Sequence, residues 1–286
     1  MRLTIEHSTR YSYRVPVAFQ PHRLMLSPRG GHDLTVLSRS LHCSPAADIS
    51  WTQDVFGNLI AMAAFPERAA DLTIVGRAEV DMTAAEWPVF AIDPSAHLYP
   101  FAYSLDDVVD LGQLRQPDWL QPGTGDIGPW ARSFVAGPST DTLALLQDLN
   151  AGVTHGITYR VRDEEGTQSP KQTLDLGSGS CRDIAALFIE AARHLGFGAR
   201  AVSGYLYDAA ATLDDAGSTH AWAEIFLPGA GWIAFDPTHR RMGGANLVPV
   251  AIGRGNRQIM PVTGGYLGAA EDFVAMEIFV KVGRIA

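Results

Sequence analysis

Three residues in the second half of this sequence have the chemistry of a covalent active site. Cys181 follows a run of alternating glycine and serine, His220 lies inside a β-rich stretch, and Asp236 ends a short apolar run. A thiol, an imidazole and a carboxylate in this order can serve as a nucleophile, its base and the acid that orients the base. Such a site would transfer an acyl group through a thioester.

The residues after Cys181 have the period of an α-helix. Apolar residues recur on one helical face, at Ile184, Leu187, Phe188, Ala191, Ala192 and Leu195. Gly196 is expected to end this helix, and Ser180 with Asp183 has the spacing of a capping box at its start. Cys181 is then about the first helical residue, where free N–H groups and the helix dipole favour a thiolate.

His220 and Asp236 are expected on neighbouring strands. Residues 199–207 and 219–227 are β-rich, and a Pro-Gly-Ala-Gly turn leads from them into a third short strand at 232–235. This turn predicts an antiparallel hairpin in which His220 and Asp236 are cross-strand neighbours. The carboxylate would then hold Nδ1 of the imidazole, while Nε2 faces the thiol.

The sequence around these residues resembles the transglutaminase-like superfamily, in the bacterial branch with an N-terminal β domain. The matching blocks lie at 179–183, 195–205, 220–224 and 231–238, with looser matches at 3–13, 250–254 and 261–262. The resemblance implies a papain-like α+β core in which Cys181 is the nucleophile, His220 the base and Asp236 the orienting acid. The branch usually continues the block at 250–254 with Asp-Tyr, where this chain has Gly255 and Asn256.

Composition and pattern divide the chain into four segments. They are an N-terminal β-sandwich-like domain at 1–85, a Pro-rich connection at 86–139, the transglutaminase-like catalytic core at 140–240 and a C-terminal β extension at 241–286. The first should contain strands at 3–13, 34–42, 49–53, 59–65 and 72–82, with a tight turn at 54–58. Helices are expected at 105–111, 128–135 and 141–154. We expect the connection and the loop at 208–218 to wall the cleft.

An oxyanion formed during acyl transfer needs hydrogen-bond donors. The N–H of Cys181 is one candidate donor, and Tyr159 and Gln172 are candidates for a second. Tyr159 matches a recurrent aromatic residue of the resembled branch. Each also has a structural interpretation, since Tyr159 could be a half-buried strand aromatic and Gln172 a helix-surface residue.

The predicted chemistry leaves the outcome of the reaction open. Water would resolve the thioester in a peptidase or amidase, and an amine would resolve it in a transglutaminase. We favour hydrolysis of peptide or isopeptide bonds, because no calcium-type acidic cluster is evident and similar bacterial proteins resemble proteases. A peptide-binding module with a vestigial cleft is the non-enzymatic alternative.

Composition limits the partners. The chain has 286 residues, 47% hydrophobic and 19% charged, as in a globular protein, and its net charge of −9 argues against a nucleic-acid surface. It has no membrane-length apolar run and no signal-peptide core, which favours the cytoplasm. Two cysteines give no disulfide framework, and Cys43 is expected to be inert. We expect a peptide or protein substrate and neither a cofactor nor a metal, because the histidines have no ligand spacing.

Overall fold

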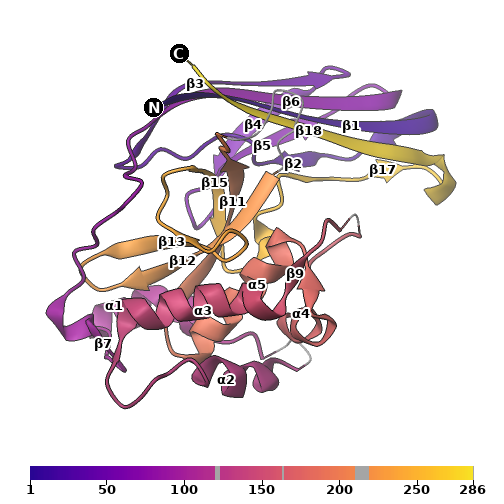
Figure 1. Ribbon diagram of the computed structural model, residues 1–286. Coiled ribbons are helices and arrows are strands. Elements are labelled where there is room, and N and C mark those ends of the chain that lie inside the picture. Colours follow the sequence, from indigo (N-terminus) through magenta and orange to yellow (C-terminus); the bar gives the residue numbers. More distant parts are fainter. Residues whose placement is uncertain (120–122, 163, 210–218, 286) are drawn as a thin grey trace.

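The computed structural model describes residues 1–119, 123–162, 164–209 and 219–285. Two strand-rich layers lie above a unit in which helices cover an antiparallel sheet (Figure 1). The chain is thus an α+β protein, as the sequence predicts. None of the helices in the described ranges is long and apolar enough to cross a membrane.

The upper part is a sandwich of two antiparallel sheets. One has the order β17-β1-β6-β3, with β18 also paired to β1, and the other has the order β16-β2-β5-β4. The strands are β1 (Arg2–Phe19), β2 (His22–Leu24), β3 (Leu34–Ser44), β4 (Asp48–Gln53), β5 (Leu59–Ala64), β6 (Ala69–Met82), β16 (Val262–Thr263), β17 (Tyr266–Leu267) and β18 (Phe273–Arg284). All five strands expected before residue 85 are present.

Alternating burial explains why these segments form sheets. Every second residue of β6 is buried from Leu72 to Met82, the two-residue period of a strand with one face on a core. Leu72 and Ile74 join side chains of both sheets in a common core, and Cys43 lies in it. Burial raises the pKa of Cys43 to about 11, so this thiol stays neutral at physiological pH, as expected of a packing residue.

The connection between the sandwich and the core contains only short elements. They are η1 (Pro94–Ala96), β7 (Leu98–Tyr99), α1 (Leu105–Leu111), η2 (Gly112–Arg115), α2 (Thr124–Arg132) and β8 (Thr140–Asp141). Helix α1 has the predicted bounds. Helix α2 begins earlier than predicted, because Gly123 has a left-handed conformation (φ 75°) that turns the chain into the helix there.

The connection braces the helix that carries Cys181. The backbone N–H of Asp118 donates to Glu190 Oε1 (2.8 Å), and Arg193 Nε donates to the carbonyl of Leu114 (3.1 Å). Glu190 and Arg193 belong to the end of that helix farthest from Cys181. These contacts place residues 114–118 against the end of the helix farthest from Cys181. That the rest of the connection walls the cleft stays a prediction.

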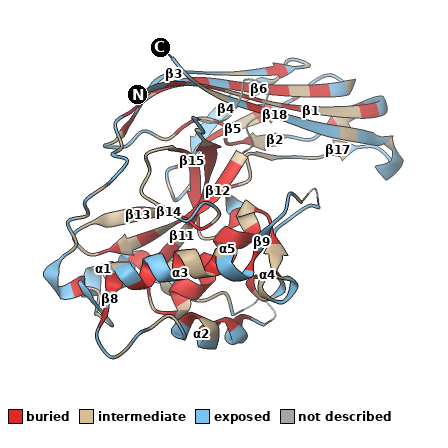
Figure 2. Cartoon of the chain, in the orientation of Figure 1, coloured by how far each residue is buried: buried red, intermediate tan, exposed pale blue. Residues whose placement is uncertain are grey.

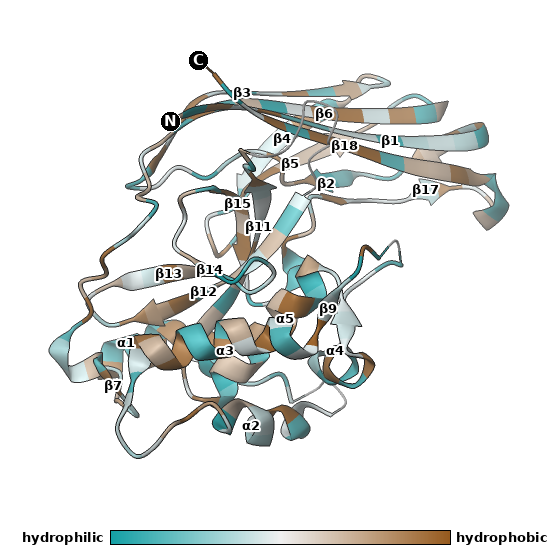
Figure 3. Cartoon of the chain, in the orientation of Figure 1, coloured by the Kyte–Doolittle hydropathy of each residue, from teal (hydrophilic) through white to brown (hydrophobic). Residues whose placement is uncertain are grey.

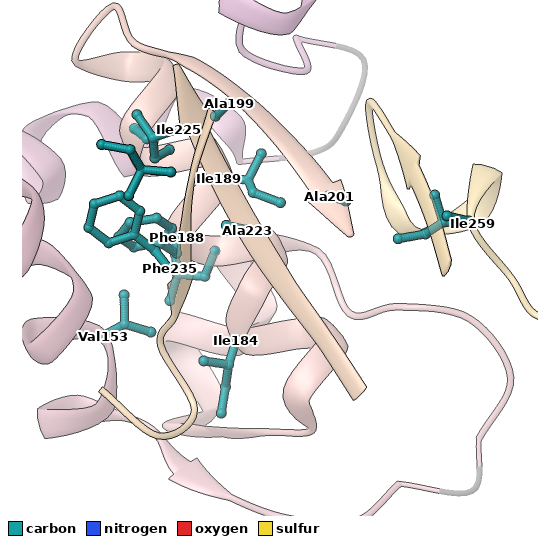
Figure 4. Packing of buried hydrophobic residues seen from close by; sticks show 14 of the residues in the cluster. Val153, Ile184, Phe188, Ile189, Ala199, Ala201, Ala223, Ile225, Phe235 and Ile259 are labelled. Atoms are coloured by element: carbon teal, nitrogen blue, oxygen red, sulfur yellow. The ribbon is translucent and has the colours of Figure 1, made fainter. Parts of the chain in front are cut away.

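The lower unit is built on one antiparallel sheet of order β14-β13-β12-β11-β15. Its elements are α3 (Thr142–Gly156), β9 (Thr158–Tyr159), α4 (Pro170–Leu176), β10 (Ser178–Gly179), α5 (Cys181–His194), β11 (Gly198–Leu206), β12 (Thr219–Leu227), β13 (Gly231–Asp236), β14 (Arg241–Met242) and β15 (Leu247–Gly253). Figure 4 shows Ile184 and Phe188 of α5 packed near Ala223 and Phe235 of the sheet. The hairpin of β12 and β13 confirms the predicted strands and turn.

Helix α5 forms where the apolar period predicts it. Its long run of buried residues, from Asp183 to Arg193, shows as an almost continuous red ribbon in Figure 2. Gly196 has a left-handed φ of 90°, and the N–H of Phe197 returns to the carbonyl of Ala192 (3.0 Å). This is the expected glycine-dependent helix end.

Residues 241–286 are shared between the two parts. Strand β15 pairs with β11 in the lower sheet, whereas β16, β17 and β18 complete the two sheets of the sandwich. The segment predicted as one C-terminal β extension therefore has two structural roles. Strand alternation predicts that these residues form strands, but it does not say which sheet edge they join.

A buried asparagine joins the two parts. The Asn58 carboxamide accepts a hydrogen bond from the Ile252 N–H (2.8 Å) and donates one to the Ile252 carbonyl (2.6 Å). It also accepts from Arg29 Nη1 (2.9 Å) and donates to Asp54 Oδ2 (2.8 Å). All four hydrogen-bonding positions of the amide are therefore used, and the side chain substitutes for a neighbouring strand beside β15.

Asn58→Ala should lower the free energy of unfolding by about 2–4 kcal/mol, because each buried group left without a partner costs about 1–3 kcal/mol. Val55→Ala is the matched control, since Val55 lies in the same turn with its side chain 94% exposed. Urea denaturation of both variants measures the difference. Equal stabilities for the two variants would show that this junction contributes nothing to the fold.

Candidate active site

Cys181 is the first residue of α5, as predicted, and its side chain is partly exposed. Gly179 leads into it from β10, which pairs in parallel with β9 so that Gly179 lies opposite Tyr159. A Cβ atom at Gly179 would come within 2.8 Å of the Asp183 Cβ, so only glycine fits this approach. The thiol therefore lies at a helix N-terminus, where the first backbone N–H groups have no intrahelical partners.

A buried carboxylate fixes this helix start. Asp183 Oδ2 accepts hydrogen bonds from both the N–H (2.8 Å) and the hydroxyl (2.7 Å) of Ser180. Arg162 Nη1 lies 2.9 Å from each carboxylate oxygen, and the Gln168 N–H donates to Oδ1 (2.7 Å). Burial would raise the pKa of Asp183, but these hydrogen bonds outweigh it and lower the pKa. The charge is therefore kept, and the peptide before Cys181 is held in place.

The hairpin brings His220 and Asp236 into contact. A ring nitrogen, Nε2 of His220, lies 2.8 Å from Asp236 Oδ2, and both side chains are buried. The register places Ala223 opposite Phe235, so Asp236 reaches His220 diagonally and not directly across the strands. Cys181 is among the groups that raise the pKa of His220, as expected of a thiol near the imidazole.

The prediction that Asp236 holds Nδ1 of His220 is wrong. Nε2 meets the carboxylate, which leaves Nδ1 as the ring nitrogen that would serve the thiol. The diagonal register explains the difference, because a carboxylate farther along the hairpin meets the ring nitrogen that lies farther from the histidine backbone. The roles of Asp236 as orienting acid and of His220 as base stay predictions, with the two ring nitrogens exchanged.

The electrostatics favour a protonated His220 beside an ionised Asp236. Burial lowers the pKa of His220, but hydrogen bonds and charge interactions with Asp236 and Cys181 outweigh it and raise the pKa to about 10. Burial opposes ionisation of Asp236, yet hydrogen bonds from His220 and His239 lower its pKa below the usual range. Because the carboxylate is ionised and accepts only, His220 donates its Nε2 proton to it. The raised pKa of His220 keeps the ring an imidazolium at neutral pH, and that positive charge would stabilise a neighbouring anion.

A second histidine that sequence reasoning missed binds the same carboxylate. His239 Nδ1 lies 2.8 Å from Asp236 Oδ2, the oxygen that also accepts from His220. The N–H groups of Thr238 (3.0 Å) and His239 (3.3 Å) donate to Oδ1. The only signal in the sequence is a histidine three residues after an Asp-Pro turn, a spacing that lets a side chain return to the turn's first residue.

Two family models match the chain. Residues 128–237 match the transglutaminase-like superfamily, and residues 3–81 match the bacterial transglutaminase-like N-terminal region. The chain belongs to the transglutaminase-like superfamily. The superfamily match contains Cys181, His220 and Asp236, and the N-terminal match covers the sandwich from β1 to β6.

Two relatives of this transglutaminase-like protein extend over its whole length. An uncharacterised protein from Mycobacterium leprae is 24% identical over 294 residues, covering 100% of this chain and 99% of the relative. The crystal structure of a candidate cysteine protease from Cytophaga hutchinsonii has a TM-score of 0.73 at 18% identity, covering 100% of this chain and 92% of that one. The fold of sandwich plus core is therefore shared, and membership of the superfamily supports a cysteine-dependent activity.

One group of side chains in the transglutaminase-like core has converging metal-ligand atoms. Donor atoms of His220, Asp236 and His239 all lie within 4.8 Å of one another. A metal ion bound there would replace both hydrogen bonds to Asp236 Oδ2, and it would need unprotonated nitrogens on both histidines. The hydrogen-bonded triad and a metal site therefore exclude each other at this position. The expectation of no metal stays a prediction.

The two candidate oxyanion donors lie in different environments. Tyr159 is half exposed, burial raises its pKa, and it lies opposite Gly179, two residues before Cys181, in the pairing of β9 with β10. Gln172 is an exposed residue in the first turn of α4, where its Oε1 accepts a hydrogen bond from the Ser169 N–H (3.0 Å). Tyr159 is thus the better placed of the two, and its role stays a prediction.

Trp222 packs beside the imidazole of His220. Its ring centroid lies 6.0 Å from that of His220 at an interplanar angle of 25°, and the side chain is buried in a small cluster with Val202 and Ile252. It is a core residue, as expected. Of the loop predicted at 208–218, residues 210–218 lie outside the described residues.

Asp236→Asn should lower the pKa of His220 from about 10 toward the ordinary histidine value of about 6.5, because the anion that stabilises the imidazolium is removed. The imidazole would then lose its proton at a lower pH than in the wild type. Imidazole 15N chemical shifts measured across a pH titration report this directly. A pKa that is unchanged in the variant would contradict the assigned electrostatics.

His239→Ala should slow alkylation of Cys181 by iodoacetamide about tenfold, since a hydrogen bond to a charged group contributes on the order of 1.5 kcal/mol. His239→Asn should restore most of the rate, because the Asn amide nitrogen can occupy the place of Nδ1. His155→Ala is the control, as this exposed histidine bonds only the nearby carbonyl of Ala151 among its described contacts. Mass spectrometry of the labelled peptide gives the rates. Equal rates for the Ala and Asn variants would contradict a role for the hydrogen bond.

Proposed function

We propose that this protein hydrolyses peptide or isopeptide amides through a thioester on Cys181. One observation carries the proposal. The buried imidazole of His220 is hydrogen-bonded to the carboxylate of Asp236, and Cys181, at a helix N-terminus, is among the groups that raise the pKa of His220. Cysteine enzymes need this arrangement, because the imidazole keeps the sulfur ionised and then supplies a proton to the leaving group.

In the acylation step, the thiolate of Cys181 attacks the amide carbonyl carbon, and the carbonyl oxygen becomes an oxyanion. Backbone N–H groups at the start of α5 are placed to donate to that oxygen. The C–N bond breaks as His220 gives its Nδ1 proton to the departing nitrogen. An amine leaves, and the acyl group stays on sulfur as a thioester.

In the deacylation step, the now neutral imidazole of His220 takes a proton from water as the water oxygen attacks the thioester. The C–S bond breaks, the carboxylic acid leaves, and the thiolate and imidazolium are regenerated. Asp236 keeps its charge throughout and stabilises the imidazolium in each half-reaction. The protons and electrons therefore balance without a cofactor.

An amine could replace water in the second step, and the triad itself does not choose between them. Two features support hydrolysis. The Cys181 side chain is partly exposed, so water can reach a thioester formed there. The chain has only two lysines, Lys171 and Lys281, and Lys171 is paired with Asp175, so the protein itself is a poor amine donor.

The test uses a peptide mixture analysed by mass spectrometry, with wild type and Cys181→Ala, each with and without millimolar ethylamine. We expect cleavage by wild type alone, with only a minor share of products carrying the amine, because water is present at about 55 M and competes. Cys43→Ala should behave as wild type, since Cys43 is buried in the sandwich.

The other outcomes decide among the alternatives. Products that mostly carry ethylamine would assign the protein as a transglutaminase with the same triad. Absence of any product, together with slow alkylation of Cys181 by iodoacetamide, would indicate a binding module with a vestigial site. Cleavage by Cys181→Ala at the wild-type rate would refute the thioester mechanism.

A further inference from the structure

The last strand leaves one edge of the sandwich uncovered. β18 pairs with β1 from Leu3 to Tyr13, and its other edge faces no strand within the described ranges. Figure 1 shows it along the front edge of the upper sheet. A row of unpaired N–H and C=O groups on a long strand is a template for another strand, and proteins usually block it with prolines, bulges or a covering segment.

The exposed strand is also strongly apolar. Val274, Met276, Ile278 and Phe279 are 56%, 49%, 50% and 43% exposed. Figures 2 and 3 show the combination, a strand that is largely exposed and largely hydrophobic. Contiguous apolar surface of this kind marks an interaction site in a soluble protein.

We propose that β18 pairs with β18 of a second copy of this chain, so that the sandwich sheet continues across a two-fold axis. Two identical strands related by such an axis are antiparallel, and each residue faces a residue of its own side of the sheet. The axis must therefore pass between the two copies of one residue of β18, which face each other across it. Each possible register is named here after that residue. Charge identifies which residue it is.

Glu277 and Lys281 are the only charged residues between Phe273 and Gly283, and both are exposed. An axis through Phe279 places Glu277 of each copy opposite Lys281 of the other. An axis through Glu277 or through Lys281 would instead place two like charges opposite each other, which destabilises a strand pair. The Phe279 register is thus favoured, because the two-fold axis creates two equivalent ion pairs between Glu277 and Lys281.

The same register continues a charge pattern that already crosses the sheet. On its outer face, two rows of alternating charge run from β6 through β1 to β18. Arg77, Glu6 and Lys281 lie directly opposite one another, and Arg10, opposite Glu277, is paired diagonally with Asp71. Arg77 Nε lies 2.7 Å from Glu6 Oε2, and Arg10 Nη2 lies 2.9 Å from Asp71 Oδ1. In the Phe279 register, Lys281 at the end of the first row faces Glu277 at the end of the second row in the other copy. Both rows therefore continue into the second copy with alternating charge.

The inner face of the strand fits the same pairing. Val280 is fully buried against the core, and Val282 is half buried. In the Phe279 register these residues face Ile278 and Met276 of the second copy, two of the exposed apolar side chains. The pairing therefore covers the apolar surface of each copy with the edge of a core that already exists.

Charge exchange tests the proposal. Wild type should be a dimer at micromolar concentrations by light scattering coupled to gel filtration. Glu277→Lys and Lys281→Glu should each be monomers, because each creates two like-charge pairs. An equimolar mixture of the two single variants should form a heterodimer, and the double variant should form a homodimer, since both restore opposite charges.

Cross-linking tests the register. Phe279→Cys in a Cys181→Ala background should form a disulfide-linked dimer on oxidation, because facing Cα atoms are about 4.5–5.5 Å apart and disulfides span about 4.4–6.8 Å. Ala275→Cys should not, since Ala275 would face Gly283 of the second copy. A wild-type monomer, a mixture that fails to associate, or cross-linking through residue 275 would each overturn the proposal. Thermal unfolding of the variants confirms that they are folded.

Discussion

The buried negative charge of Asp236 is the constraint on which the active site depends. The residue is 1% exposed, and an uncompensated charge at such depth would cost several kcal/mol. His220 and His239 donate to one carboxylate oxygen, and two backbone N–H groups of the turn donate to the other. The hairpin and the turn after it must close correctly to supply these donors. The orientation of the His220 imidazole is therefore a consequence of the hydrogen bonds that stabilise the buried charge of Asp236.

A second buried carboxylate does the same for the nucleophile. Asp183 is fully buried and receives donors from Ser180, Gln168 and Arg162. Arg162 and Gln168 belong to the loop before α4, and Ser180 belongs to the start of α5. The position of Cys181 is therefore held both by the loop and by its own helix. Cys181 and His220 are thus positioned by separate polar networks, one at a helix start and one in a hairpin. Each network must be complete, because a partly satisfied buried network destabilises the fold.

Local sequence patterns predict the parts of the site that depend on neighbours along the chain. The start of α5 at Cys181 and the hairpin follow from helical period, glycine positions and a turn sequence. The choice of Nε2 over Nδ1 in His220 cannot be predicted this way, since a diagonal and a direct register have the same alternation. His239 has no distinctive spacing, because its contact with Asp236 depends on how one turn bends. The sheet that β18 joins is likewise a tertiary choice that alternation leaves open.

The two parts of the molecule complete each other. The sandwich needs β16, β17 and β18 from the end of the chain, so residues 1–85 alone lack three of its strands. The lower sheet in turn has its edge strand β15 held by Asn58 of the sandwich, and Tyr205 of β11 donates to the carbonyl of Leu26 (3.1 Å). One hydrophobic core also runs through both parts. Because β11 pairs with β12, the strand that carries His220, the sandwich stabilises the sheet on which His220 lies. Unfolding of the sandwich should therefore be coupled to loss of the site.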